Sequence, residues 1–138
     1  MTLTKHDVLR YFYDLLRTSP LAAEVSGDVY YSSQRPRDSR QEDITVGFVS
    51  GLPNQVQTGV VAICIYVPNI DPYANGVFVE DSERTAHLER VAQEWIDSIP
   101  NRGSGYVLRL QSAIDTLADE QTNHHFVSIM IHYSYFDE

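Results

Sequence analysis

The run "QVQTGVVAICIYVPN", residues 55–69, constrains the fold more than any other part of the sequence. Its first half is mostly polar, whereas its second half is apolar on both faces that an extended chain presents. Apolar side chains on both faces are typical of a strand in the middle of a sheet. We therefore predict one long strand that starts at an exposed end of a sheet and finishes in its middle.

Four further segments carry strand signals. Residues 43–50, 105–114 and 125–136 each alternate between two sets of side chains, as half-buried strands do. The shorter "DVYY" at residues 28–31 is also typical of a strand. The turn residues of "GLPN", 51–54, predict a hairpin that joins 43–50 to the long strand.

Two segments carry the periodicity of amphipathic helices. Residues 4–19 and 81–99 repeat apolar side chains at three- and four-residue steps. Thr4 is the expected cap of the first helix, and Asp81 or Ser82 is the expected cap of the second. The residues expected to end the two helices are Pro20, Pro100 and Gly103.

The predicted elements follow one another in the order α-β-β-β-α-β-β. A short helical turn at residues 21–27 follows the first helix, and a polar connection at residues 115–124 precedes the last strand. Since two helices cannot supply parallel crossovers between five strands, the sheet should be mostly antiparallel. We therefore predict a single α+β domain over residues 1–138, with about five strands in a mostly antiparallel sheet and two helices packed on it.

The charge balance limits the partners of the chain. Its formal net charge is -9, and most of the acidic excess follows Ile70. Nucleic-acid binding requires a basic surface that releases counterions, so we expect no specific binding of DNA or RNA.

Segments that direct a chain to a membrane or out of the cell are not apparent. The start "MTLTKHDVLR" lacks the apolar region of a leader, and no apolar run approaches the roughly 20 residues of a membrane span. The single cysteine, Cys64, cannot form an internal disulfide and is expected to be a small buried side chain. We expect a soluble protein, made in a reducing cytoplasm, without membrane partners.

The sequence contains no convincing catalytic constellation. It lacks the G-x-S-x-G elbow, the P-loop and the G-x-G-x-x-G motif. His124 and His125 are the most metal-like feature, but neighbouring side chains on a strand point to opposite faces. We therefore predict no catalytic residue, no cofactor and no metal site, and no enzymatic activity.

The stretch "SSQRPRDSRQED", residues 32–43, mixes three arginines with three acids and has no large apolar side chain. Three alternatives are open: a solvated or flexible loop, an arm that contacts another copy of the chain, and an anion site. Its own acids weaken the last, whereas arginine and mixed charge suit a self-complementary contact. The subunit-interface candidates are Arg35, Arg37, Asp38, Arg40, Glu42 and Asp43.

Taken together, these segments resemble a known family. The run "VSGDVYYSSQRPRDSRQEDITVGFVSG", the strand "QTGVVAICIYVPN", the helix "DSERTAHLERVAQEWIDSI" and two closing strands are similar to small phage tail terminator, or tail completion, proteins, including those that prophages encode. The resemblance covers roughly residues 3–135. The long polar loop at residues 32–43 and the connection after Asn69 depart from the family pattern.

The resemblance implies a structural role. Members form a ring, usually hexameric, that caps the tail tube and joins it to the connector. The expected partners are therefore further copies of the chain and other tail or connector proteins. The expected location is the virion tail, and the host cytoplasm during assembly. The alternative from a different class is a small α+β enzyme or ligand-binding domain with a site between helix and sheet.

Overall fold

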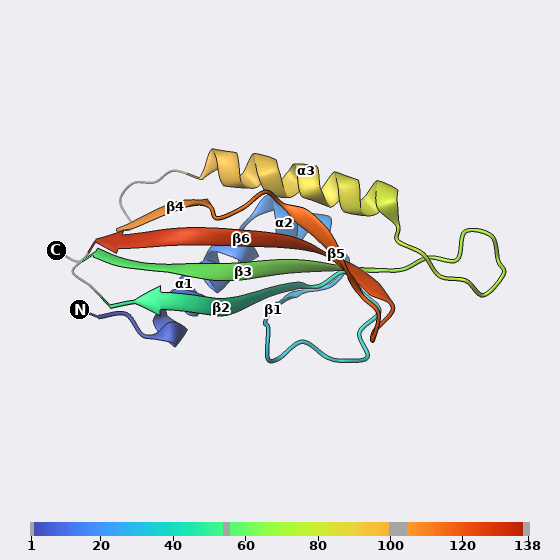
Figure 1. Cartoon of the computed structure of the whole chain (residues 1–138), viewed down its shortest axis with the longest axis horizontal. Coiled ribbons are helices and arrows are strands. Elements are labelled where there is room, and N and C mark those ends of the chain that lie inside the picture. The colour runs from blue at the N-terminus through green and yellow to red at the C-terminus, as the bar shows by residue number, and fades with distance from the viewer. Residues whose placement is uncertain (1, 54–55, 100–104, 137–138) are drawn as a thin grey trace.

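The computed structural model of the chain describes residues 2–53, 56–99 and 105–136. Within these ranges the chain forms three helices and six strands, arranged as an elongated body (Figure 1). The helices are α1 (Lys5–Arg17), α2 (Pro20–Glu24) and α3 (Ser82–Ser98). The strands are β1 (Val29–Tyr31), β2 (Ile44–Leu52), β3 (Val56–Pro68), β4 (Tyr106–Leu110), β5 (Asp115–Asp119) and β6 (His124–Phe136).

The strands form one sheet in the order β1-β2-β3-β6-β4, and β5 also pairs with β6. β3 and β6 are paired along their whole length, from Val56 opposite Phe136 to Pro68 opposite His124. β4 and β5 pair with successive parts of the outer edge of β6. All pairs are antiparallel except β1 with β2. The predicted α+β fold with a mostly antiparallel sheet is confirmed.

The prediction of a polar connection at residues 115–124 is wrong in its first half. Asp115–Asp119 is strand β5, which forms a hairpin with β6 through a turn that contains Asn123 in the left-handed region, at φ 59°. The polar side chains of β5 concealed it, because an edge strand is held by backbone hydrogen bonds and leaves much of its side-chain surface in water. The strand predicted at residues 105–114 is correspondingly shorter and ends at Leu110.

The helix starts follow the predicted capping residues. Thr4 and Asp7 form a reciprocal capping box at α1, and Asp81, rather than Ser82, caps α3 by accepting from the amide of Arg84. Ser19 caps the short helix α2, which has Pro20 at its first position. The predicted breakers Pro100 and Gly103 and part of the predicted turn at 51–54 lie outside the described residues.

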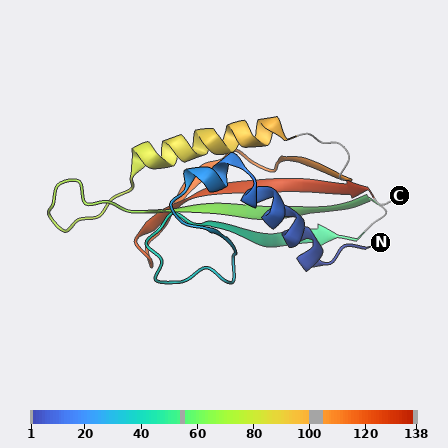
Figure 2. The ribbon, with the colours of Figure 1, turned by 180° about the vertical axis from the view of Figure 1, so that it is seen from behind.

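The helices cover one face of the sheet. α1 and α2 lie behind the sheet in Figure 1 and in front of it in Figure 2, and α3 contacts α2 and β6. Alternate residues of the two long central strands point into this core and are buried. They are Val61, Ile63, Ile65 and Val67 of β3, and Val127, Ile129, Ile131 and Tyr133 of β6. The largest side chains that the helices add include Phe12, Leu16, Leu88 and Trp95.

Candidate functional site

The charged stretch at residues 32–43 folds back onto the sheet, where Arg35 connects it to β3. The Arg35 guanidinium carbon lies 4.1 Å from the ring centroid of Tyr66, and Nε donates to Oδ2 of Asp43 at 3.0 Å. The side chain of Arg35 is 8% exposed and that of Asp43 is 0% exposed. A cation stacked on an aromatic ring and paired with a buried carboxylate is an internal structural arrangement, not a free anion site.

Asp43 joins three segments through its remaining acceptors. Its Oδ2 accepts from the hydroxyl of Ser39, and its Oδ1 accepts from the amide of Asp28. Its carbonyl oxygen accepts from the amide of Tyr66 on β3. Gly27 lies so close that an added Cβ would meet Oδ1 of Asp43 at 2.0 Å. Buried carboxylates need such complete bonding, so Asp43 serves the fold of its own chain.

His124 closes the other side of this cluster. Its Nδ1 lies 2.8 Å from the carbonyl oxygen of Thr122 and therefore carries the proton, which leaves Nε2 to accept from Arg35 at 3.5 Å. Burial lowers the pKa of His124, and the nearby cations of Arg35 and Arg40 add to the effect. His124 is thus a neutral histidine that holds the loop to the start of β6.

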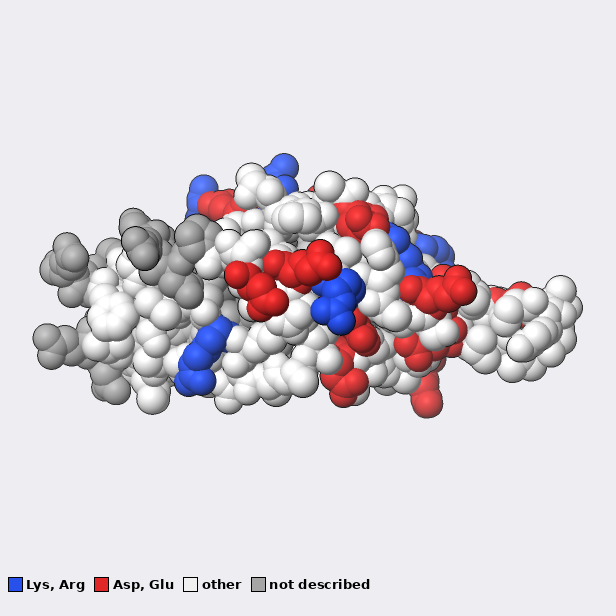
Figure 3. Space-filling view, turned by 90° about the horizontal axis from the view of Figure 1, so that it is seen from above, with Lys and Arg blue, Asp and Glu red and all other residues white. Residues whose placement is uncertain are grey.

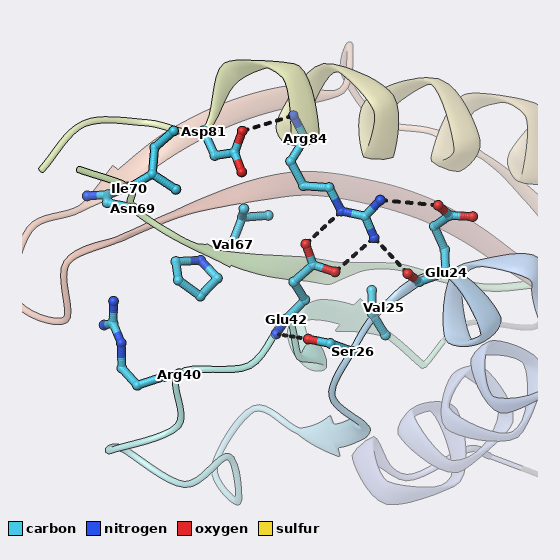
Figure 4. Close-up of a pocket in the computed structure, with 11 residues that line it drawn as sticks. Glu24, Val25, Ser26, Arg40, Glu42, Val67, Asn69, Ile70, Asp81 and Arg84 are labelled. Atoms are coloured by element: carbon cyan, nitrogen blue, oxygen red, sulfur yellow. Dashed lines mark hydrogen bonds and ion pairs between the residues drawn. The ribbon is translucent and has the colours of Figure 1, made fainter. Parts of the chain in front are cut away.

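A second charged cluster lines an open pocket of about 440 Å³ between α2, the charged stretch and the start of α3 (Figure 4). Arg84 donates to both carboxylate oxygens of Glu42, at 2.6 and 2.8 Å, and to the side chain and carbonyl of Glu24 at 3.2 and 2.6 Å. The hydrogen bonds to Glu42 raise the pKa of Arg84 above its ordinary value. Because the guanidinium of Arg84 already makes four hydrogen bonds to Glu42 and Glu24, whose carboxylates offset its charge, it has little attraction left for an anion.

The six interface candidates therefore divide into two groups. Arg35, Glu42 and Asp43 form ion pairs within the chain. Arg37 and Asp38 are exposed, and so is Arg40, although its Nη1 donates to the carbonyl of Thr122 at 2.8 Å. Because Asp43 is fully enclosed, its predicted contact with a partner subunit is not supported. The prediction stays open for the outward-facing members.

The histidine pair does not converge on one point. His125 lies on the opposite face of β6 from His124, and its Nδ1 lies 2.7 Å from Oδ1 of Asn69. Among the described residues, no group of three His, Cys, Asp or Glu side chains is placed to hold a metal ion. Within the same ranges, no helix is long and apolar enough to cross a membrane.

The face of the sheet away from the helices carries a feature that our sequence analysis missed. β2, β3 and β6 contain no Lys, Arg, Asp or Glu at all, although 21% of the whole chain is charged. Hydrogen-bonded register brings half-buried side chains of these strands together on that face. This open face consists of Gly47, Val60, Ala62, Cys64, Tyr66, Phe126, Ser128, Met130 and His132. The absence of charged residues from these three strands could have been seen in the sequence.

The connection after Asn69 is a second feature whose form our sequence analysis did not predict. Residues 70–79 project from the end of the body as a narrow arm, which is closed at its base by the Ile70–Val79 bridge (Figure 1). At the tip, the two carboxylate oxygens of Asp71 accept from the amides of Asn75 and Gly76, at 3.1 and 2.9 Å. The exposed apolar side chains of the arm are Ile70, Tyr73, Val77, Phe78 and Val79.

Comparison with known proteins assigns no family. No family model matches the chain, and no curated protein matches it. One solved structure aligns with 95% of this chain and 96% of its own length, at a TM-score of 0.47 and 13% sequence identity. The name of that structure describes no activity, and at this level of similarity it carries no inference about function.

Proposed function

We propose that this chain is a structural protein that assembles with copies of itself, of the phage tail terminator or tail completion type. The observation that carries the proposal is the open face, which three strands without a charged residue form on a chain of net charge -9. An antiparallel sheet with one solvated face ordinarily alternates apolar side chains inward and polar side chains outward. Here Val60, Ala62, Phe126 and Met130 occupy the outward positions.

A sheet face whose own strands carry no charged residue favours association between copies. Two chains of charge -9 repel each other over most of their surfaces, and the repulsion is weakest where neither carries charge. Contiguous apolar surface on a soluble domain marks a place of contact with another protein. The exposed Arg37, Asp38 and Arg40 suit the polar rim of such a contact.

The position at the end of a tail tube rests on the family resemblance of the sequence. The structure adds that Arg35 and Arg84 are neutralised by carboxylates of their own chain, which suits a structural protein better than an anion-binding enzyme. The proposed partners are further copies in a ring and the neighbouring tail or connector proteins. The proposed location is the virion tail.

Sedimentation velocity over a wide range of protein concentration tests self-assembly. The wild-type chain should form a discrete species larger than a monomer, and Ala62→Glu, which places a carboxylate on the open face, should remain monomeric. Arg10→Gln changes the net charge by the same amount at an exposed position on α1 and should assemble like the wild type. Equal assembly of the wild-type and Ala62→Glu chains would contradict the proposal.

A separate measurement tests the tail role. Purified protein is added to isolated tail tubes and located by immunogold electron microscopy. Label at one end of each tube supports the terminator assignment. Label along the whole tube, or none on tubes while the protein assembles alone, would leave a self-associating protein without a terminator role.

A further inference from the structure

We propose that the arm, residues 70–79, is the element by which one copy grips the next, and that it binds the open face of that second copy. This inference rests on the proposed self-assembly and names the two surfaces that meet. The arm and the open face are different parts of the same chain. The contact is therefore head-to-tail, the kind that closes into a ring when its rotation allows.

The arm exposes large apolar side chains that a partner could cover. Tyr73 is 79% exposed, Val77 is 59% exposed and Phe78 is 49% exposed. Three large apolar side chains within six residues, at the end of a projection, are not the solvated side chains of an ordinary surface loop. In Figure 3 the arm is almost entirely white, whereas the charged side chains gather over the body of the molecule.

The arm is also shaped before it binds. The Ile70–Val79 bridge holds its base through two backbone hydrogen bonds of 2.9 and 2.8 Å. Asp71 holds the tip through two amides, and the side chain of Asn75 accepts from the amide of Val77 at 3.0 Å. A binding segment that is already ordered loses less conformational entropy when it docks.

Charge selects a second copy as the occupant of the open face. The only charge of the arm belongs to Asp71, and its carboxylate is already engaged by backbone amides. The three strands of the open face supply no Lys or Arg, and the two arginines at its border are Arg35, which is paired with Asp43, and Arg109, which lies opposite His132. Asp115 and Asp119 of β5 also border the face, opposite Ser128 and His124, and disfavour an acidic partner segment. The arm and the strands of the open face therefore add little to the repulsion between two chains of net charge -9.

The dimensions agree with this pairing. The open face spans residues 60–66 of β3 and 126–132 of β6, so at about 3.3 Å per residue it is roughly 20 Å long. A two-stranded arm of ten residues extends about 15 Å on the same scale. The arm leaves its own body at the end of β3 and points away from it, so its own open face is out of reach (Figure 1). The face of a neighbour can receive it.

The first experiment removes each surface in turn. The arm variant combines Tyr73→Ser with Phe78→Ser, and the face variant is Ala62→Glu. Leu52→Ser is the matched control, because Leu52 is 60% exposed and lies at the opposite end of the sheet from the arm. In sedimentation velocity, the arm and face variants should each be monomeric, and the control should assemble like the wild type. Circular dichroism melts verify that all of them are folded.

Mixing the two defective variants gives the sharper result. The arm variant keeps an intact face and the face variant keeps an intact arm, so an equimolar mixture should form pairs of twice the monomer mass and nothing larger. A mixture that stays monomeric overturns the arm-to-face contact.

Direct contact is tested by cross-linking. The photoreactive residue p-benzoylphenylalanine at position 73 should cross-link to peptides from β3 or β6 of another copy, identified by mass spectrometry of mixed isotope-labelled chains. The same residue at position 94, an exposed position on α3, is the control and should give no such product.

The outcomes separate this inference from the proposed function. A wild-type chain that never self-associates overturns both. Assembly that persists in the arm variant overturns the arm contact alone and leaves the proposed function standing. An arm variant that assembles normally but no longer binds another tail protein also overturns the inference, because the occupant would then not be a second copy.

Discussion

The Nε atom of Arg35 lies 3.0 Å from Oδ2 of Asp43, and both side chains are almost completely removed from water. This ion pair turns the charged stretch at residues 32–43 into part of the folded body. Arg35 also stacks on Tyr66 of the central strand β3, which fixes the charged stretch to the sheet. The stretch therefore lies over one end of the open face, where its outward-facing members border any contact made there.

Replacing Arg35 should strongly destabilise the protein. Arg35→Ala leaves the carboxylate of Asp43 buried without its cation, which costs about 3–5 kcal/mol of the free energy of unfolding. Urea denaturation measures the loss. Arg37→Ala removes an exposed arginine from the same stretch and should change the free energy of unfolding by less than about 0.5 kcal/mol.

A double-mutant cycle with Asp43→Asn tests the cause of that loss. If the pair itself is responsible, Arg35→Ala should cost much less in the Asp43→Asn background, because no carboxylate is then left unpaired. Equal losses in both backgrounds would mean that stacking on Tyr66, and not the ion pair, accounts for the effect.

Gly27 should tolerate no side chain. An added Cβ would lie 2.0 Å from Oδ1 of Asp43 and 2.5 Å from the carbonyl oxygen of Glu42, so the loop has to move. Gly27→Ala should lower the free energy of unfolding by about 1–3 kcal/mol in urea denaturation. Gly47→Ala is the comparison, because its closest neighbour is the rotatable hydroxyl of the exposed Ser32, at 2.9 Å. A loss in Gly47→Ala as large as that in Gly27→Ala would contradict this explanation.

How far the sequence predicts this structure depends on the range of the contacts. Periodicity identified the long strand and both main helices, because the pattern of buried side chains in such elements depends only on residues that are close in the sequence. It missed β5, whose polar side chains conceal a strand held by pairing with β6. It also left the role of Arg35 open, because the partner His124 lies 89 residues away. The uncharged central strands were visible in the sequence, yet their common face became apparent only with the register.

Glu24 should make stability depend on pH in the acid range. A hydrogen bond from His87 at 2.7 Å, followed by that from Arg84, lowers the pKa of Glu24 below its ordinary value of 4.5. The unfolded chain then binds a proton first as the pH falls, so the stabilisation is present above pH 4.5 and is lost as the pH falls through the lower folded pKa. As the pH falls across this range, the free energy of unfolding should decrease less steeply in Glu24→Gln than in the wild type. The slope for His87→Ala should lie between the two. Identical slopes would contradict the prediction.

Cys64 should be nearly unreactive in the folded chain. Burial raises the pKa of its thiol to about 11, against a smaller opposing effect of the hydrogen bond with Thr45. At pH 8 the thiolate fraction should be on the order of a hundredfold smaller than in the unfolded chain, and the rate of modification by Ellman's reagent should fall with it. Tyr73→Cys in a Cys64→Ser background places a thiol on the exposed arm and should react at an ordinary rate. Rapid modification of folded Cys64 would contradict its placement.

The tip of the arm should depend on Asp71. Asp71→Ala removes the acceptors of the Asn75 and Gly76 amides, each worth about 1 kcal/mol, so both amides should exchange faster with deuterium. Asp71→Asn keeps one acceptor oxygen and should show an intermediate rate, while the amides of β3 and β6 should exchange as in the wild type. Unchanged exchange at Asn75 and Gly76 would show that the tip is held by something else. Because a looser arm has more entropy to lose on docking, Asp71→Ala should also assemble more weakly than Asp71→Asn in sedimentation, although both variants lose the same charge.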